Sequence, residues 1–470
     1  MKLILYIYIC ILITIMAEFC FGIVIFFPNR YPRKKLSAKP STDAGDPLLL
    51  TPYLQQGSIK LAQNLSIVAL TEKIGVRSHA GFFTVDDKYQ SNLYFWYFPP
   101  FSKNVDAPVM LWLQGGPGVS SLFGLFIENG PIIAKKDGFA TRKYHWALDN
   151  HLIFIDSPVG TGFSFTKSDE GYCKNETCIS EGLYNCMQQF FTLFPDLRKN
   201  DFYISGESYA GKYIPSLAME IHKQNSKLDN NSINLKGLAI GNGYCDPINQ
   251  INYGKYLYQL GLIDDNQIKV FEMYQKQIVL EIKQKDWLKA DLFMDRLMDG
   301  QVSNFSFFKS FTGFDDYYNF LETKDNVNVD TLFNLLQNDY VRHSIHVGGL
   351  QFHDGLQVQI FLASDMMKSV APYIEELLSF YKIMFYNGQL DIVVGYPLTV
   401  DFLRNLNFSA GDEYKNAKRK FWKVDDDLAG YIKKAGNLTE VLVRNAGHMV
   451  PYDQPKWALD LITRFIKDKL

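Results

Sequence analysis

The stretch "DFYISGESYAGKYIP", residues 201–215, decides the fold that we expect for this chain. A short apolar strand, "FYIS", runs directly into "GES", and a helix-like segment follows. A strand, a sharp turn and a helix around a serine are the context of a nucleophile elbow, whose usual pattern is G-x-S-x-G. Here the last small residue is Ala210, which still permits close helix–strand approach. The motif alone leaves Ser208 open as a nucleophile or as an ordinary serine that caps a helix.

Apolar runs of strand length recur on both sides of this motif and alternate with helical patterns. The runs are "APVMLWLQ", "HLIFID", "DFYISG", "LKGLAIGNG", "KIMFYNG" and "EVLVRNAG", preceded by a hairpin of "AGFFTV" and "SNLYFWYF". They predict an α/β fold with a mainly parallel sheet, helices on both faces and an antiparallel edge. Between about Cys245 and Val347 the sequence becomes polar, aromatic and helix-like, which predicts an inserted, mostly helical cap. We therefore expect a core of residues 48–245 and 346–470, with the cap at 246–345.

Composition and the N-terminus restrict the class of protein. The 470 residues are 47% hydrophobic and carry a formal net charge of -2, with no basic excess that would favour nucleic acid. Lys2 precedes a long apolar run, and the small residues Cys20 and Gly22 suit cleavage of a signal peptide of residues 1–22. An uncleaved membrane anchor is the alternative. With cleavage, residues 23–47 form an irregular lead, and we expect no stable membrane span.

Two further patterns agree with export. The glycosylation sequence N-x-S/T begins at Asn64, Asn175, Asn230, Asn304, Asn407 and Asn437. Cys173 and Cys178, in "CKNETC", suit a small disulfide loop in an oxidising compartment. Cys186 and Cys245 then either pair or stay reduced, because four cysteines allow three pairings. No C-x-x-C pair or histidine cluster suggests zinc, and we expect no metal site.

A nucleophilic serine needs a base, and the base needs an acid that orients it. In the α/β-hydrolase arrangement they follow the serine in the order Asp or Glu, then His. Asp391 lies just beyond a strand in "MFYNGQLDIVVG", and His448 lies in the loop of "VLVRNAGHMVPYDQP". Both side chains are expected at the carboxyl edge of the sheet. The order predicts a triad of Ser208, Asp391 and His448, although His448 taken alone suits an ordinary loop histidine.

The glycine-rich segment "LWLQGGPGVSSLFGLFIENGP" follows another strand. Its glycines let backbone N–H groups approach a substrate oxygen closely. We predict that the N–H groups of Gly116 and Tyr209 form an oxyanion hole. A phosphate-binding loop is the rival interpretation, and the absence of a following G-K-[ST] disfavours it.

These segments resemble the signature blocks of serine carboxypeptidases, as do "IDSPVGTGFSF", "IGNGYCDP", "YNGQLDIVVG" and "NAGHMVPYDQP". The resemblance runs from about Pro47 to the C-terminus, and "LTPYLQQG", "SNLYFWYFPP" and "SIHVGG" place it closest to the vitellogenic-like branch. It implies an α/β-hydrolase that removes C-terminal amino acids from peptides or proteins through an acyl-enzyme. It implies no metal or organic cofactor and a secreted or lysosomal location, and it leaves homodimer formation open.

The resemblance also implies which residues bind the substrate's terminal carboxylate: Gln114, Gly115, Glu128 and Glu207. Gln114 stands where the family commonly has Asn. If the two glutamates lie close together, their pKa values rise, and a protonated glutamate donates a hydrogen bond to the carboxylate. We therefore expect an acidic pH optimum, with binding weakening toward neutral pH. Each glutamate taken alone also suits a structural hydrogen-bond partner.

Two other functions stay open at this point. An acyltransferase or esterase uses the same scaffold and the same acyl-enzyme. A non-catalytic binding or stabilising partner is the second, because a fold does not fix a function. The complete triad favours an enzyme, and the carboxylate-binding set favours a carboxypeptidase.

Overall fold

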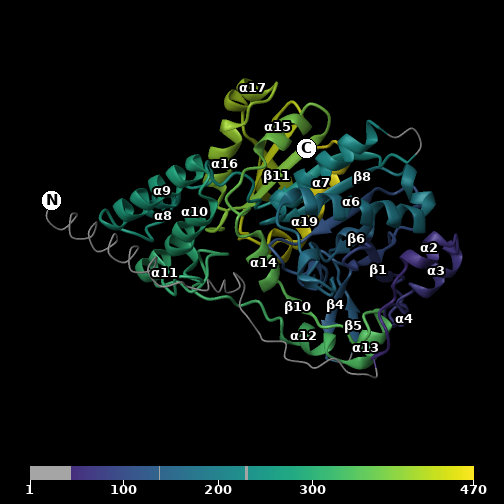
Figure 1. Cartoon of the computed structure of the whole chain (residues 1–470). Coiled ribbons are helices and arrows are strands. Elements are labelled where there is room, and N and C mark those ends of the chain that lie inside the picture. The colour runs from purple at the N-terminus through teal and green to yellow at the C-terminus, as the bar shows by residue number, and fades with distance from the viewer. Residues whose placement is uncertain (1–43, 137, 228–230) are drawn as a thin grey trace.

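The computed structural model describes residues 44–470, except 137 and 228–230 (Figure 1). The expected signal peptide at 1–22, nearly all of the lead at 23–47, and the glycosylation candidate Asn230 therefore lie outside the described residues. In the described part of the chain, no helix has both the length and the apolar character that a membrane span requires.

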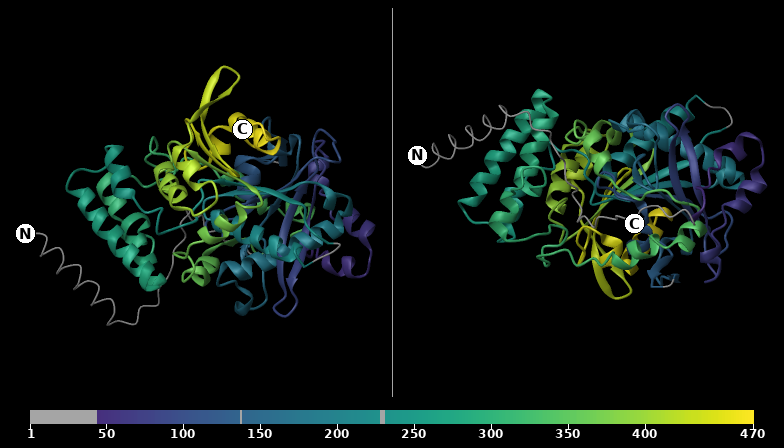
Figure 2. Two further views of the ribbon diagram at one scale, coloured as in Figure 1. Left: turned by 90° about the horizontal axis from the view of Figure 1, so that it is seen from above. Right: turned by 60° about the horizontal axis from the view of Figure 1, so that its bottom comes forward.

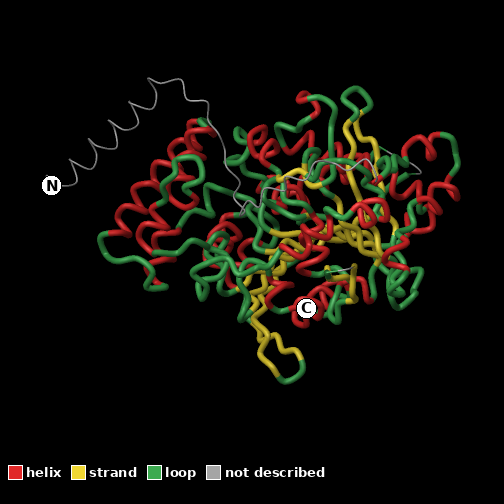
Figure 3. The backbone as a smooth tube through the Cα atoms, turned by 90° about the horizontal axis from the view of Figure 1, so that it is seen from below, coloured by secondary structure: helices red, strands yellow, loops and turns green. Residues whose placement is uncertain are grey.

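One ten-stranded sheet forms the centre of the molecule (Figures 1 and 3). Its strands are β1 (His79–Asp86), β2 (Ser91–Phe98), β3 (Val109–Leu113), β6 (His151–Ile155), β8 (Phe202–Glu207), β9 (Leu235–Gly241), β11 (Lys382–Gly388), β12 (Lys420–Val424), β13 (Asp427–Ala435) and β14 (Leu438–Val443). The spatial order is β1-β2-β6-β3-β8-β9-β11-β14-β13-β12. The six strands from β6 to β14 are parallel, and an antiparallel hairpin lies at each edge. The mainly parallel sheet and the opening hairpin are thus confirmed.

The central strands are apolar throughout because both faces of the sheet are covered. Along β3, Leu111 packs into the hydrophobic cluster on one face, whereas Met110 and Trp112 pack into the cluster on the other. Helices that contribute to the first cluster are α3 (Ile59–Leu65), α6 (Glu176–Leu193), α7 (Ala210–Asn225), α14 (Leu356–Leu362), α15 (Ala371–Leu377), α16 (Tyr396–Asn405) and α17 (Gly411–Asn416). Those of the second are α4 (Ala69–Glu72), α5 (Ser121–Phe123), α12 (Asp330–Leu336), α13 (Asp339–Ser344), α18 (Val450–Asp453) and α19 (Pro455–Ile466).

A third hydrophobic cluster belongs to the helices that follow β9 (Figures 1 and 2). They are α8 (Tyr253–Gln259), α9 (Gln267–Gln284), α10 (Trp287–Met294) and α11 (Phe307–Thr312), and they stand beside one end of the sheet in Figure 2. Helices α12 and α13 lie within the range expected for the cap, yet Leu332, Leu336 and Val341 pack into the second cluster of the core. The division into core and cap at residues 246 and 345 stays a prediction.

Two small features bear on the expected export. Cys173 and Cys178 form a disulfide at the start of α6, while Cys186 and Cys245 are buried and free. The five asparagines of glycosylation sequences that the structure describes are all exposed: Asn64, Asn175, Asn304, Asn407 and Asn437. Their glycosylation stays a prediction.

Candidate active site

Ser208 occupies the turn between β8 and α7. Its φ of 62° lies in the left-handed region, which non-glycine residues rarely adopt. The serine carbonyl accepts hydrogen bonds from the N–H groups of Gly211 and Tyr244, each at 2.9 Å, and its own N–H donates to the Gly241 carbonyl at 3.0 Å. Backbone contacts from β9 and α7 thus hold the serine in a sharp strand–turn–helix conformation, as the motif predicts.

The glycine-rich loop after β3 packs directly against this turn. A Cβ atom on Gly115 would lie 2.6 Å from the backbone nitrogen of Tyr209 and 2.7 Å from the Cβ of Ser208. Gly116 has a φ of 115°, a conformation that favours glycine. Gly116, Ser208 and Tyr209 line one pocket, together with residues of the expected cap that include Met298. The two expected oxyanion-hole residues therefore lie beside the serine.

Asp391 and His448 meet at the carboxyl ends of β11 and β14. The Nδ1 atom of His448 lies 2.9 Å from Oδ2 of Asp391, and both side chains are almost completely buried. The Nε2 atom of His448 is buried without a hydrogen-bond partner among the described residues, so no bond joins it to Ser208. Such contacts between a base and its nucleophile commonly tighten only when substrate binds.

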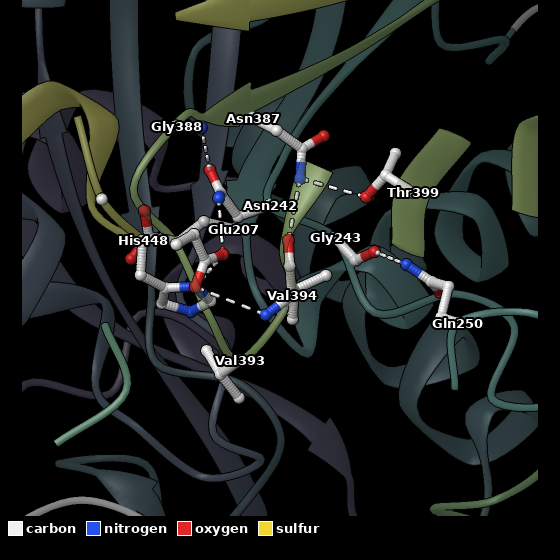
Figure 4. Close-up of polar contacts among 12 residues, drawn as sticks. Glu207, Asn242, Gly243, Gln250, Asn387, Gly388, Val393, Val394, Thr399 and His448 are labelled. Atoms are coloured by element: carbon white, nitrogen blue, oxygen red, sulfur yellow. Dashed lines mark hydrogen bonds and ion pairs between the residues drawn. The ribbon is translucent and has the colours of Figure 1, made fainter. Parts of the chain in front are cut away.

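Asn242, at the end of β9, is a site residue that sequence reasoning missed (Figure 4). Its Nδ2 group donates to Oδ2 of Asp391 at 2.6 Å, and its Oδ1 accepts from the N–H of Gly388 at 3.2 Å. Its φ of 41° is one that asparagine tolerates better than most residues. The available signal was an asparagine between two glycines at a strand end, in "GLAIGNG".

Further hydrogen bonds fix the loop that carries Asp391 (Figure 4). Nδ2 of Asn387 donates to the Val394 carbonyl at 2.9 Å and to Oγ1 of Thr399 at 3.0 Å. The hydroxyl of Tyr256, from helix α8, donates to the Asp391 carbonyl at 2.7 Å. The loop is therefore held both by the end of β11 and by helix α8.

Gln114, Glu128 and Glu207 form a buried cluster next to the serine turn. Nε2 of Gln114 donates to Oε1 of Glu207 at 2.7 Å and to Oε1 of Glu128 at 3.1 Å. The Gln114 oxygen accepts from the indole N–H of Trp112 at 2.9 Å, which fixes the orientation of the amide. Glu207 directly precedes Ser208, and Gly115 directly follows Gln114. The expected carboxylate-binding residues and the serine thus share one small region.

Burial decides the protonation of the two glutamates. It raises the pKa of Glu128 to about 7. It also raises the pKa of Glu207 well above its ordinary value, and the negative charge of Glu128 adds to that effect. A carboxyl group whose pKa is raised keeps its proton to higher pH. The pair therefore retains a proton under mildly acidic conditions. In the described chain, no group of three or more His, Cys, Asp or Glu side chains is arranged to bind a metal.

Residues 69–468 match the family model described as serine carboxypeptidase. The chain belongs to the serine carboxypeptidase family. It is 49% identical over 448 residues to the venom serine carboxypeptidase of Apis mellifera, covering 94% of this chain and 96% of that protein. It is 50% identical over 444 residues to the vitellogenic carboxypeptidase of Aedes aegypti, covering 92% and 94%. For the probable serine carboxypeptidase CPVL of Homo sapiens the identity is 42% over 464 residues, covering 97% and 96%.

A solved relative shows the same architecture. Kex1(Δ)p, a prohormone-processing carboxypeptidase from Saccharomyces cerevisiae, superposes with a TM-score of 0.69 at 25% identity, covering 86% of this chain and 95% of that one. The expected α/β-hydrolase fold and the serine carboxypeptidase class are thus confirmed. As a serine carboxypeptidase, the protein has peptides as its class of substrate.

In this serine carboxypeptidase, a short segment at 317–320 contacts both loops of the Asp391–His448 pair. The Tyr317 carbonyl accepts from the N–H groups of Ile392 and Val393, each at 3.1 Å, and the Tyr318 carbonyl accepts from the His448 N–H at 2.7 Å. The Tyr318 ring also stacks on the His448 imidazole, with 5.1 Å between ring centroids. The segment between α11 and α12 is therefore part of the wall around the histidine.

Proposed function

We propose that Ser208, His448 and Asp391 act as a catalytic triad that releases the last residue of a peptide chain. The observation that carries this proposal is the adjacency of two groups. Glu207, hydrogen-bonded to Gln114 at 2.7 Å, directly precedes the serine in the strained turn. A peptide whose terminal carboxylate is bound by that cluster places its last peptide bond next to Ser208. The site therefore selects the end of a chain rather than an internal bond.

The chemistry that this geometry supports is acyl transfer. Ser208 Oγ attacks the last peptide carbonyl while His448 Nε2 accepts its proton. The N–H groups of Gly116 and Tyr209 stabilise the oxyanion. The C–N bond then breaks, the imidazolium returns the proton to the leaving amine, and the acyl group stays on the serine. A water molecule, deprotonated by His448, hydrolyses the ester, and Asp391 orients the imidazole throughout.

The pKa values of the glutamates give this reaction a pH dependence. When one glutamate is protonated, it donates a hydrogen bond to the substrate's carboxylate. When pH rises and the proton is lost, the carboxylate faces an added negative charge. We therefore propose an acidic optimum in which KM rises from acidic to neutral pH. Michaelis constants that stay flat over this range contradict the proposal.

We also propose that the protein works in the secretory pathway, either secreted or in lysosomes. The disulfide between Cys173 and Cys178 and the five exposed glycosylation sequences support this location. A cap at residues 246–345 remains part of the same proposal, with α8 to α11 as its helical body. Light scattering of the purified protein tests whether it forms a homodimer.

The decisive experiment compares an N-blocked dipeptide with its C-terminal amide, using wild type and Ser208→Ala. Release of the last amino acid from the acid alone, abolished in Ser208→Ala, is the expected result. A serine that reacts with a fluorophosphonate reagent but releases no amino acid from the acid indicates an esterase or acyltransferase. A serine that does not react indicates a non-catalytic binding protein.

A further inference from the structure

Lys212 is a completely buried lysine on the first turn of α7, four residues after Ser208. Its Nζ group donates to the backbone carbonyls of Asp365 at 2.8 Å and of Met366 at 2.6 Å. Both carbonyls belong to the segment that follows α14. A buried ammonium is unfavourable unless it is paired and hydrogen-bonded, so its place in the core requires these contacts.

Nearby carboxyl groups favour the charged form of this lysine. Burial lowers the pKa of Lys212 to about 8, and the negative charges of Glu176 and Asp365 oppose that shift. Glu176 lies at the start of α6, and burial raises its own pKa to about 8. The lysine is therefore an ammonium at acidic and neutral pH. The hydrogen bonds to the two carbonyls are then charge-assisted and hence strong.

The Lys212 ammonium lies next to residues that surround the nucleophile. Nζ is 5.1 Å from the ring centroid of Tyr209 and 5.9 Å from that of Tyr244, within the range of cation–π attraction. Tyr209 carries one of the N–H groups proposed for the oxyanion hole. The Tyr244 N–H donates to the Ser208 carbonyl at 2.9 Å. Lys212 therefore contacts both neighbours that define the serine turn.

We propose that Lys212 is a positioning residue for the reaction: it ties residues 365–366 to the serine turn and so holds the Tyr209 N–H on the developing oxyanion. The inference rests on the proposed function. The hydrogen bonds of the Lys212 ammonium go to the carbonyls of Asp365 and Met366, whereas Gln114 bonds Glu128 and Glu207 in the carboxylate-binding cluster. Its removal therefore affects the transition state more than substrate binding.

The test uses Lys212→Met, which keeps the length of the side chain and removes its donors, in the full-length glycosylated protein. The kcat for a peptide acid is calculated per mole of reactive serine. The amount of reactive serine is measured by complete titration with a fluorophosphonate. We expect kcat to fall by about 10- to 100-fold, less than the loss typical when a whole oxyanion donor is removed. We expect KM to change by less than about threefold, because the contacts that bind the substrate before the reaction are unaffected.

A second pair of variants separates positioning by Lys212 from the effect of burying two ionisable side chains together. Glu176→Gln alone is expected to keep kcat near that of wild type. The double variant Lys212→Met/Glu176→Gln removes both ionisable side chains, and its kcat is expected to stay as low as that of Lys212→Met. Recovery of kcat in the double variant overturns the inference. If Lys212→Met alone does not fold, the double variant provides the same comparison.

The outcomes also separate this inference from the proposed function. If wild type releases no amino acid, or Ser208→Ala retains activity, the proposed function fails. If wild type is active, Ser208→Ala is inactive and the Lys212 variants keep wild-type kcat per titrated serine, only the role of Lys212 is wrong.

Discussion

The Nδ2 group of Asn242 donates to Oδ2 of Asp391 at 2.6 Å, the same oxygen that Nδ1 of His448 approaches at 2.9 Å. One carboxylate oxygen thus has two nitrogen neighbours from two different strand ends. The asparagine fixes the rotation of the carboxylate, and the carboxylate in turn fixes the imidazole. A neutral donor provides this restraint without adding charge beside the pair.

We predict that Asn242→Ala lowers kcat by about 10- to 100-fold, because Asp391 loses the donor that fixes its orientation and misplaced catalytic groups are costly. The steady-state kinetics of a peptide acid check this. KM is expected to change little, because the side chain of Asn242 bonds Asp391 and the Gly388 N–H rather than the carboxylate-binding residues. Since Asn242 also accepts from the Gly388 N–H, circular dichroism must show a native spectrum. A folded variant with unchanged kcat contradicts the prediction.

We predict that Glu128 makes the protein less stable as pH rises from about 4.5 to about 7. Its folded-state pKa is raised from 4.5 to about 7 by burial, so the folded protein keeps a proton that the unfolded chain releases in this window. The contribution is complete below pH 4.5 and is lost as pH passes 7. One proton changes the free energy of unfolding by at most about 1.4 kcal/mol per pH unit.

Urea denaturation of Glu128→Gln at several pH values measures this effect. The fall in stability between these pH values is expected to be smaller in Glu128→Gln than in wild type. Glu181→Gln, at an exposed position on α6, serves as the control and is expected to follow wild type. Parallel curves for wild type and Glu128→Gln indicate that Glu128 retains no additional proton on folding.

We predict that Gly115→Ala severely reduces activity. The added Cβ atom would lie 2.6 Å from the Tyr209 nitrogen and 2.7 Å from the Ser208 Cβ, so the loop and the serine turn must separate. Gly182→Ala is the matched control, since the nearest atom to its Cβ would be 3.9 Å away. Within helix α6 this change is expected to be neutral or to stabilise by about 0.5–1 kcal/mol. Activity of Gly115→Ala equal to that of Gly182→Ala contradicts the prediction.

We predict that replacing both Cys173 and Cys178 by Ser lowers stability without abolishing activity. The disulfide closes a loop with a sequence separation of only 5 residues, so its chain-entropy contribution is about 2 kcal/mol. Thermal unfolding is expected to shift downward, while kcat at 25 °C stays within about twofold. A large fall in kcat instead indicates that the loop supports the buried region around Glu176.

The sequence was sufficient to predict that three candidate site residues lie together, because each follows an apolar strand. Ser208, Asp391 and His448 each follow such a strand, and a parallel sheet brings these ends to one edge. The role of Asn242 was not predicted, because it depends on β9 lying next to β11, which the strand order alone establishes. Lys212 was missed for a different reason, since lysines on helices are usually solvent-exposed.

The sequence patterns also did not predict the hairpin of β12 and β13 or the packing of helices α12 and α13 on the core. Strand β12 has three exposed lysine or aromatic side chains at residues 420, 421 and 423, so it lacks the continuous apolar run of a central strand. Helices α12 and α13 follow the cap sequence without a clear change in composition, and only their buried leucines and valine place them on the core.

The hydrogen bonds from segment 317–320 to the loops of Asp391 and His448 restrict how the insertion can diverge between related enzymes. Helices α9 to α11 can change length or surface while the sheet is preserved, which allows new substrate preferences to evolve. The four residues at 317–320 lack that freedom, because a register shift there would displace the backbone of both loops together. Insertions and deletions that enzymes of this architecture tolerate should therefore fall before Tyr317 rather than within the segment.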